Sequence, residues 1–309
     1  MRILRDLQAG GEPIALAIGN FDGVHLGHQA ILDRTVAIAR ERGLASAVMS
    51  FEPLPREFLS AASAPPRLAT LREKLTVFAA HGIDIAHVCR FDARFAAQSP
   101  LEFAERLAGP LGARWVHVGR DFRFGAKRAG DVAMLTQAGA QIGFEVEVLP
   151  TLLSGDVRIS STAVREALAA GRLDIATALL GRPYSMCGRV VHGAKLGRTL
   201  GFPTANIALG RERPALGGVF AVKCFGAATR GLEGVASLGS NPVVTKNGPA
   251  TLETFLFDFS GDLYGRRLAI EFHRKLRDEA DYGSLDALVA QIGRDVEHAR
   301  DYFSGQAKR

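Results

Sequence analysis

The chain has 309 residues, enough for two domains of ordinary size, and 47% of them are hydrophobic. Its net charge is +6 and its pI about 9.5, but the 38 basic and 32 acidic residues are interspersed, which favours a protein that handles anionic small molecules over one that binds nucleic acid. The three cysteines are far apart and odd in number, which argues against a disulfide framework and a cysteine zinc site and indicates a reducing compartment. No run approaches the roughly 20 apolar residues of a membrane span, and no signal peptide is recognisable, so we expect a cytoplasmic protein without a membrane partner.

The first half of the chain alternates short apolar runs with amphipathic stretches. The apolar runs predict buried strands at Ile14–Ile18, Ala45–Phe51, Ile85–Phe91, Arg114–Gly119 and Phe144–Leu149. Helical periodicity predicts helices over Gln29–Arg42 and Leu68–Ala80, and "SPLE" at Ser99–Glu102 begins another with serine as its N-cap. This alternation predicts a parallel sheet covered by helices, in which ligands bind beyond the carboxyl ends of the strands.

The second half of the chain has a different rhythm. From Ser160 to Leu180 the sequence predicts a helix broken at Gly171, and "GRPY" ends it, so we place a domain boundary there, between residues 1–183 and 184–309. Predicted strands then follow at Gly188–His192, Val219–Phe225, Gly234–Leu238, Leu252–Phe259 and Arg267–Phe272. Glycine, proline and asparagine turns separate them, which predicts a small antiparallel barrel or sandwich, followed by an amphipathic helix over Ser284–Phe303.

The stretch "AIGNFDGVHLGHQAIL", Ala17–Leu32, places two histidines in a glycine-rich turn between a predicted strand and a predicted helix. A histidine pair is most often structural, and a zinc site is disfavoured because no nearby Cys or His completes the ligand set. Glycines at such a junction let a phosphate approach backbone N–H groups, and imidazoles there can donate to phosphate oxygens. "HLGH", with His25 and His28, resembles the H-x-G-H signature of nucleotidyltransferases, which transfer a nucleoside monophosphate from ATP and release pyrophosphate.

Two later stretches extend this resemblance. "VGRDFRFGAKRAGD", Val118–Asp131, has aromatic and basic residues that suit a flat ring and phosphates, although it also suits an ordinary loop with two core phenylalanines. "RISSTAVREAL", Arg158–Leu168, opens a helix with consecutive hydroxyl residues, for which simple N-capping is the alternative. Together with "GNFDGVHLGH" and "FEPLPREF", their order resembles the N-terminal module of bacterial bifunctional riboflavin kinases/FAD synthetases. Leu54 departs from the histidine of many relatives, so we expect no polar contact there.

"GRVVHGAKLGRTLGFPTANI", Gly188–Ile207, combines a glycine-rich loop with the polar pair of "PTAN". The loop residues that could surround phosphates are Gly193, Gly197, Gly201, Lys195 and Arg198. On a strand, Thr204 and Asn206 point to the same face, and their oxygens suit Mg²⁺ bound to ATP, with a polar β-turn as the alternative. The segment resembles the riboflavin kinase signature.

The match continues in "TLETFLFDFSGDLYG" and "HRKLRDEADYGSLDALVAQIGRD". Glu253 lies between apolar neighbours, where a carboxylate is costly without partners or a task, although a solvent-facing strand residue is the alternative. The resemblance implies that Glu253 is the general base for the ribityl hydroxyl of riboflavin and that Arg277 lies near the flavin or phosphates. Val243 departs from the Asn-Pro-Thr of relatives, so flavin affinity in that loop is expected to differ.

The resemblance covers about Ile14 to Phe303. It implies a Rossmann-type α/β domain with a parallel sheet, then a small antiparallel β-barrel with a C-terminal helix. It also implies phosphorylation of riboflavin to FMN by ATP, and AMP transfer from ATP to FMN, giving FAD and pyrophosphate, with Mg²⁺ as metal, ATP as co-substrate, and FMN and FAD as products or bound ligands.

The resemblance assigns each candidate residue a role. The catalytic candidates are His25, His28 and Glu253. The ATP- and phosphate-binding candidates are Gly19, Asn20, Phe21, Gly27, Ser161, Thr162, Arg165, Gly193, Lys195, Gly197, Thr204 and Asn206. The flavin-binding candidates are Asp121, Phe122, Arg128 and Arg277, and the metal-binding candidates are Thr204 and Asn206.

Two alternative functions differ in kind from this one. The barrel can be an FMN-binding module only, given Val243, which leaves a single-activity FAD synthetase. A nucleic-acid-binding protein fits the pI, but clustered basic residues interleaved with aromatics are missing. We expect small-molecule partners and no nucleic acid, and the sequence indicates no oligomeric state.

Overall fold

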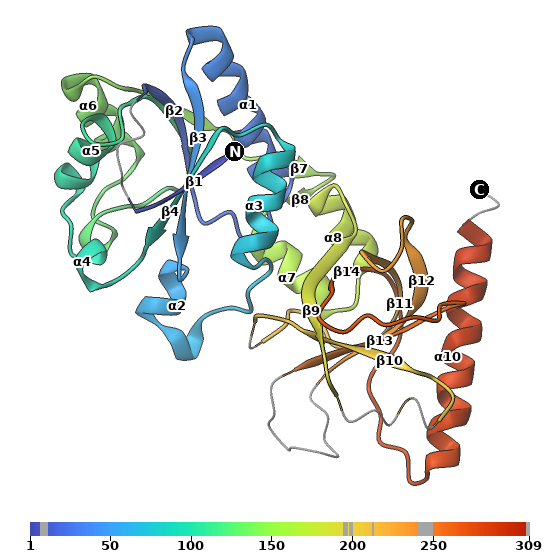
Figure 1. The fold of residues 1–309 in the computed structure, drawn as a ribbon. Coiled ribbons are helices and arrows are strands. Elements are labelled where there is room, and N and C mark those ends of the chain that lie inside the picture. Colours follow the sequence, from blue (N-terminus) through green and yellow to red (C-terminus); the bar gives the residue numbers. More distant parts are fainter. Residues whose placement is uncertain (7–11, 194–196, 198–199, 212, 240–249, 307–309) are drawn as a thin grey trace. The chain divides into compact units, whose positions relative to one another are not determined.

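The computed structural model describes every residue except 7–11, 194–196, 198–199, 212, 240–249 and 307–309 (Figure 1). The predicted loop residues Lys195 and Arg198 and the departure at Val243 therefore lie outside the described residues. The chain forms two compact units, whose segments are Met1–Pro65 with Leu71–Ser160, and Pro66–Thr70 with Ser161–Arg309.

The first unit is built on a parallel sheet. Its strands are β1 (Arg2–Arg5), β2 (Ile14–Ile18), β3 (Ala45–Glu52), β4 (Ile85–Arg90), β5 (Ala113–Gly119) and β6 (Glu145–Leu149). In the described residues they follow the order β1-β4-β3-β2-β5-β6, and every neighbouring pair is parallel. The chain adds strands to one side of β2 and then to the other, so the order reverses between β2 and β5. Sheets of this kind bind ligands at the carboxyl ends of the strands beside such a reversal.

Helices cover both faces of this sheet, with α1 (Leu26–Arg42) and α3 (Leu71–Ala80) on one face and α5 (Pro100–Ala108) and α6 (Val132–Ile142) on the other (Figure 1). Alternate residues of β2 serve the two faces. Leu16 packs in a cluster with Phe103 of α5, whereas Ala17 packs in a second cluster with Leu32 of α1 and Phe78 of α3. Because both faces of β2 are buried, its sequence is an uninterrupted run of apolar residues.

Short elements connect these layers. They are α2 (Pro55–Leu59), the 3-10 helices η1 (Ala61–Ser63) and η2 (Ala126–Arg128), α4 (Ala93–Ala96), and the hairpin of β7 (Leu153–Ser154) and β8 (Val157–Arg158). The five strands predicted for this half are confirmed, and β1 and α6 were not predicted. The helix predicted from Leu68 begins instead at Leu71, and the carbonyl of Leu68 accepts hydrogen bonds from Tyr184 and Arg211.

The second unit is a closed barrel with helices. In the described residues the antiparallel strands follow the order β10-β13-β12-β11-β14-β9 around the wall. Their bounds are β9 (Tyr184–Val191), β10 (Thr204–Ala208), β11 (Gly218–Phe225), β12 (Leu232–Gly239), β13 (Thr251–Leu256) and β14 (Arg267–Arg277). The helices are α7 (Ser161–Ala169), α8 (Leu173–Leu180) and α10 (Leu285–Gln306). The predicted barrel is thus confirmed, and closure pairs both edges of the sheet that the described strands form.

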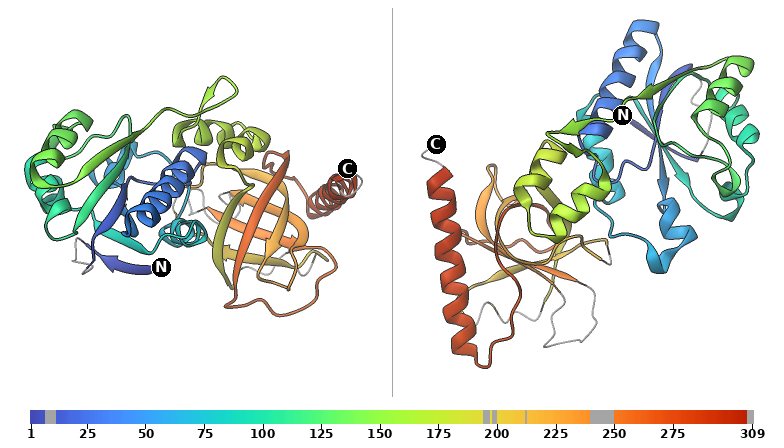
Figure 2. Two further views of the ribbon diagram at one scale, coloured as in Figure 1. Left: turned by 90° about the horizontal axis from the view of Figure 1, so that it is seen from above. Right: turned by 180° about the vertical axis from the view of Figure 1, so that it is seen from behind.

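Helix α10 packs on the outside of the barrel wall (Figures 1 and 2). Ala299 and Phe303 of the helix join Val219, Val235 and Phe257 in one buried cluster. The C-terminal amphipathic helix predicted from Ser284 is confirmed, with its first residue at Leu285.

The segment Pro66–Thr70 is bound within the second unit by polar side chains. The hydroxyl of Tyr184 donates to the carbonyl of Leu68 at 3.0 Å, and Nη1 of the buried Arg211 donates to the same carbonyl at 2.8 Å. The units divide between Ser160 and Ser161. The boundary between functional modules at residue 183 stays a prediction.

Candidate active sites

A pocket of about 240 Å³ opens where β2, β5 and β6 end, in the first unit. The last residues of these strands, Ile18, Gly119 and Leu149, all belong to its lining. Its lining also contains these predicted site residues: Gly19, Phe21, His25, Gly27, His28, Asp121 and Phe122. The pocket therefore lies at the reversal of strand order, where ligands bind in sheets of this kind.

The turn that carries the histidines has an unusual backbone. Phe21 and Val24 have φ angles of 50° and 41°, a left-handed conformation that is uncommon outside glycine and costs on the order of 1–3 kcal/mol. Both side chains are fully buried, and the Phe21 ring lies 5.3 Å from that of Phe78 on α3. Packing therefore fixes the turn, which places His25 as the N-cap of α1.

The two imidazole rings are stacked, with centroids 3.7 Å apart and planes 17° from parallel. Nδ1 of His25 accepts a hydrogen bond from the backbone N–H of His28 at 3.3 Å. Burial holds the pKa of His28 well below its usual value, and the nearby His25 and Lys74 lower it further. His28 is therefore neutral at pH 7. A neutral imidazole can still donate one hydrogen bond. The buried Nδ1 of His28 has no hydrogen-bond partner among the described residues.

Behind this turn lies a buried lysine that the sequence reasoning missed. Lys74 of α3 is fully buried, and its Nζ donates to the carbonyl of Asn20 at 3.2 Å and to Oγ of Ser50 at 2.9 Å. A buried ammonium thus holds the backbone of a predicted phosphate-binding residue. The sequence does indicate that Lys74 is buried, because it lies on the same helical face as Leu71 and Phe78, and the apolar periodicity assigns that face to the core.

The loop after β5 contributes only part of what was predicted. Phe122 lines the pocket, whereas Phe124 is a core residue whose ring stacks on it at 5.5 Å. Asp121 pairs with Arg158, and this hydrogen bond lowers the pKa of the carboxyl. Arg128 is exposed, with a φ of 59°, and is not part of the pocket lining.

The predicted phosphate-binding residues Ser161, Thr162 and Arg165 belong to the second unit, at the start of α7. Ser160, directly before them, lines the pocket of the first unit. Nε of Arg165 donates to the carbonyl of Pro66 at 2.7 Å. The part that these residues play in binding ATP stays a prediction.

In the barrel, strand register brings together the predicted kinase residues. Asn206 of β10 lies directly opposite Glu253 of β13, and Oγ1 of Thr204 donates to Oε2 of Glu253 at 3.3 Å. Thr204 and Asn206 are two residues apart on one strand, so they share a face with this carboxylate. Leu252 and Thr254 are buried, whereas Glu253 between them is half-buried on the other face of the strand.

Two glycines of the glycine-rich loop, Gly193 and Gly197, lie directly against Thr204 and Asn206, whereas a Cβ on Gly201 would meet nothing within 4 Å. A Cβ on Gly193 would come within 2.5 Å of the side-chain amide of Asn206. A Cβ on Gly197 would collide with the carbonyl oxygen of Phe202 and lie 3.3 Å from Oγ1 of Thr204. Close approach of the loop backbone to "PTAN" therefore requires glycine at both positions.

Known proteins resemble the chain over its whole length. The family described as FAD synthetase matches residues 8–163, and the family described as riboflavin kinase matches residues 180–303. The bifunctional riboflavin kinase/FMN adenylyltransferase of Escherichia coli K12 is 46% identical over 98% of both chains. The protein of that name in Pseudomonas fluorescens is 45% identical over 100% of this chain and 99% of its own. The chain belongs to the bifunctional riboflavin kinase/FMN adenylyltransferase family.

A solved structure shows the same fold. The crystal structure titled macrolide-efflux protein from Streptococcus pneumoniae is 28% identical and covers 97% of this chain and 99% of its own, with a TM-score of 0.82. In the described part of this chain, no helix has the length and apolar character needed to cross a membrane.

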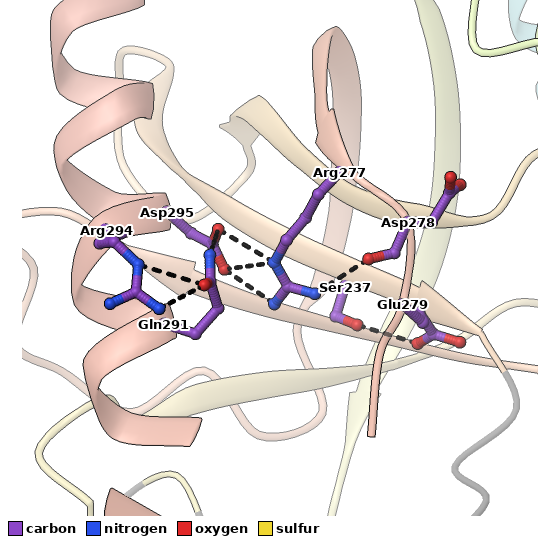
Figure 3. Close-up of polar contacts among 7 residues, drawn as sticks. All are labelled: Ser237, Arg277, Asp278, Glu279, Gln291, Arg294 and Asp295. Carbon is purple, nitrogen blue, oxygen red and sulfur yellow. Dashed lines mark hydrogen bonds and ion pairs between the residues drawn. The ribbon is translucent and has the colours of Figure 1, made fainter. Parts of the chain in front are cut away.

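The two family matches divide the candidate residues of this riboflavin kinase/FMN adenylyltransferase family member. The FAD synthetase match contains the pocket with His25 and His28, and the riboflavin kinase match contains Thr204, Asn206 and Glu253. Arg277 also lies in the second match. It forms an ion pair with Asp295 of α10 (Figure 3), a residue that no sequence motif marks as functional.

Proposed function

We propose that the barrel phosphorylates riboflavin to FMN with ATP, and that the sheet unit, with the start of α7, transfers AMP from ATP to FMN. The observation that carries the proposal is the pair of sites itself. One unit holds a glycine-rich turn with stacked histidines that lines a pocket, and the other holds a carboxylate opposed to a hydroxyl and an amide.

In the barrel, Glu253 acts as the general base. Its carboxylate accepts the proton of the ribityl hydroxyl, and the hydroxyl oxygen bonds to the γ-phosphorus of ATP. The bond from the γ-phosphorus to the bridging oxygen breaks, and ADP leaves with the electron pair. The hydrogen bond from Thr204 at 3.3 Å orients the carboxylate for this step.

The oxygen donors of this site fit Mg²⁺. Thr204 and Asn206 offer a hydroxyl and an amide oxygen beside the Glu253 carboxylate, and hard oxygen ligands are those that Mg²⁺ prefers. Among the described residues, no three His, Cys, Asp or Glu side chains gather as a metal site, so ATP phosphates would supply much of the coordination. When bound, the ion neutralises charge on the transferred phosphoryl group.

In the sheet unit, the phosphate of FMN is itself the nucleophile. One of its oxygens bonds to the α-phosphorus of ATP, the bond to the bridging oxygen breaks, and pyrophosphate leaves. The phosphate is ionised at pH 7, so a strong general base is unnecessary. His25 and His28 donate hydrogen bonds to phosphate oxygens that gain charge in the transition state.

The remaining candidates bind the substrates of this second reaction. Backbone N–H groups at Gly19, Asn20, Phe21 and Gly27, with Ser161, Thr162 and Arg165, hold the phosphates of ATP. Asp121, Phe122 and Arg128 contact the flavin substrate.

The module boundaries proposed for the two activities are 1–183 and 184–309. We also propose that the enzyme acts in the cytoplasm, where thiols such as its three cysteines stay reduced, and that its partners are small molecules.

A time course by chromatography tests the proposal. The purified chain is incubated with riboflavin, ATP and Mg²⁺, and FMN and FAD are separated and quantified. FMN should accumulate first and FAD later. If FAD forms from added FMN but nothing forms from riboflavin, the barrel is a flavin-binding module and the kinase assignment is wrong.

A further inference from the structure

Two buried side chains meet at the backbone carbonyl of Asn20, shortly after β2. Nζ of Lys74 on α3 donates to this oxygen at 3.2 Å, and Oγ of Ser50 on β3 donates to it at 3.3 Å. The ammonium also donates to Oγ of Ser50 at 2.9 Å, so the three groups form a closed triangle. Lys74 is fully buried and Ser50 is 2% exposed. The carbonyl of Asn20 is therefore fixed by two donors, one of which is charged.

The burial of Lys74 is costly for the core of the first unit. Lys74 lies one helical turn before Phe78, which packs in one apolar cluster with Phe21 and Val24. An ammonium in such surroundings raises the free energy of the fold unless it has partners or a task. Ser50 alone can satisfy the carbonyl of Asn20. The charged second donor therefore fixes the direction of this carbonyl more firmly than pairing alone requires.

The other polar groups of Asn20 are exposed. In the described part of the chain, neither its N–H nor its carboxamide has a hydrogen-bond partner. Its neighbours Gly19 and Phe21 both line the pocket, whereas Lys74 and Ser50 are not part of the lining. The two buried residues thus cannot touch a substrate, but they hold a residue beside the pocket that offers three N–H donors to one.

We propose that Lys74 and Ser50 are positioning residues of the AMP-transfer site, which hold the Asn20 carbonyl inward so that the carboxamide and N–H of Asn20 donate to the phosphates of ATP. The inference rests on the proposed function, in which the backbone of Asn20 binds these phosphates. It adds the Asn20 side chain as a direct contact and two buried residues that act through it. Donors that are fixed in advance need no reorganisation when charge develops on the phosphates.

Ser50→Ala in the full chain tests this role, because it removes one donor and leaves the ammonium in place. In AMP transfer, the KM for ATP should rise about fivefold, as expected for one hydrogen bond, while the KM for FMN and the rate of riboflavin phosphorylation stay unchanged. Inhibition by pyrophosphate should weaken by the same factor. Inhibition by adenosine, which has no phosphate, should not change, whereas a merely structural role would weaken both inhibitors alike.

Ser46 provides a matched control near the other end of β3. It is 1% exposed, and its Oγ donates to Oδ2 of Asp84 at 2.7 Å. Ser46→Ala therefore removes a buried serine hydrogen bond from the same strand, and its loss of Tm should be at least that of Ser50→Ala. Inhibition of this variant by pyrophosphate should remain that of the wild type.

Substitution of Asn20 itself separates direct contact from positioning. Asn20→Ala removes the carboxamide and keeps the carbonyl with its two donors, so inhibition by pyrophosphate should weaken about tenfold through the loss of a hydrogen bond to a charged group. Because part of what Ser50 positions is then missing, Ser50→Ala should have a smaller effect in this background than in the wild type. An undiminished effect would mean that Ser50 does not act through Asn20.

The Asn20–Phe21 peptide can be observed directly, because the pair Asn-Phe occurs once in the chain. Labelling with carbonyl-¹³C asparagine and ¹⁵N phenylalanine gives a single cross-peak in a carbonyl–amide correlation spectrum. Pyrophosphate should shift this peak in the wild type. Ser50→Ala should move its carbonyl frequency in the free chain, since one donor to that carbonyl is lost, and Ser46→Ala should not.

The results that contradict the inference are distinct from those that contradict the proposed function. A peak that stays in place while pyrophosphate inhibits, unchanged inhibition by pyrophosphate in Ser50→Ala, or an equal weakening in Ser46→Ala would overturn the inference alone. A wild-type chain that forms no FAD from FMN would overturn the proposed function as well.

Discussion

The two candidate sites are assembled in different ways. In the first unit, one contiguous turn supplies the histidines, the backbone that we propose to bind phosphate and the N-cap of α1, and buried side chains hold it in a left-handed conformation. In the second unit, Thr204 and Glu253 are 49 positions apart in the chain and meet only through strand register. We call the first a turn-built site, because it depends on the buried side chains that support one turn. We call the second a register-built site, because it depends on how neighbouring strands pair.

The largest expected effects separate the two sites. Glu253→Gln should lower riboflavin phosphorylation about 10³-fold, because a general base is lost, and should leave AMP transfer to FMN unchanged. His28→Asn should lower AMP transfer about 10²-fold, because a donor to the phosphates is lost, and should leave phosphorylation unchanged. The two rates are measured separately, from riboflavin and from FMN. Loss of both activities in either variant would contradict separate sites.

Substitution of Lys74 tests whether its buried ammonium supports the turn of the first unit. Lys74→Met should lower AMP transfer about 10²-fold without affecting riboflavin phosphorylation, because the carbonyl of Asn20 loses its buried ammonium donor and the turn shifts. Arg72→Met, at an exposed position of the same helix, is the control and should leave both rates unchanged. Wild-type AMP transfer by Lys74→Met would mean that burial of Phe21 and Val24 alone fixes the turn.

The sequence predicts the residues of the turn-built site better than it predicts the buried residue that supports the turn. His25, His28 and the glycines are contiguous, so their chemistry can be inferred without a fold. Lys74 is 54 positions from Asn20, and only the packing of α3 brings its ammonium to the turn. Strand β2 was predictable because it is apolar on both faces, whereas β1 is a short strand with arginine at each end, and no local pattern encodes its pairing with β4.

The register-built site was predictable in part. Thr204 and Asn206 could be placed on one face because the side-chain period of a strand is two. Their meeting with Glu253 depends on pairing between β10 and β13, which local sequence does not specify. Asp295 was hidden for a different reason: an aspartate in an amphipathic helix is normally expected to face solvent, and only its contact with Arg277 shows otherwise.

Low pH should also lower the folding stability of the first unit, because a histidine is buried in its sheet. Burial lowers the pKa of His117 on β5 to about 4, below the usual value of 6.5 that it regains on unfolding. The unfolded chain therefore binds a proton below pH 6.5 that the folded unit does not, so stability is lost as the pH falls toward 4, by about 3 kcal/mol.

Urea unfolding at pH 7 and pH 4.5, followed by fluorescence, measures this loss. Trp115, the single tryptophan of the chain, is buried beside His117 with ring centroids 5.0 Å apart, so its fluorescence reports on the sheet unit. His117→Phe should reduce the loss of stability, and the same substitution at the exposed His298 should leave it unchanged. An equal loss of stability in the His117→Phe variant would assign the acid sensitivity to other groups.

The smallest expected effects come from two glycines, one in each site. A Cβ on Gly27 would lie 3.2 Å from Cε1 and Nδ1 of the His25 ring, so the ring must shift by a few tenths of an ångström. Gly27→Ala should therefore lower AMP transfer about tenfold. Because Gly27 lies within α1, alanine should at the same time stabilise the helix by up to about 1 kcal/mol. Reduced AMP transfer with an unchanged or higher Tm would show that the loss comes from the ring and not from unfolding.

Gly193→Ala makes the corresponding change in the kinase site, but with a different expected outcome for stability. Its Cβ would lie 2.5 Å from the Asn206 amide, and no helix gains from the substitution, so riboflavin phosphorylation should fall at least tenfold without any rise in Tm. Gly217→Ala is the matched control, because its Cβ meets nothing closer than the Leu238 carbonyl at 3.5 Å. If Gly193→Ala retains full phosphorylation while Gly27→Ala loses AMP transfer, the register-built site tolerates displacement of Asn206, and the backbone of the loop is not required against "PTAN".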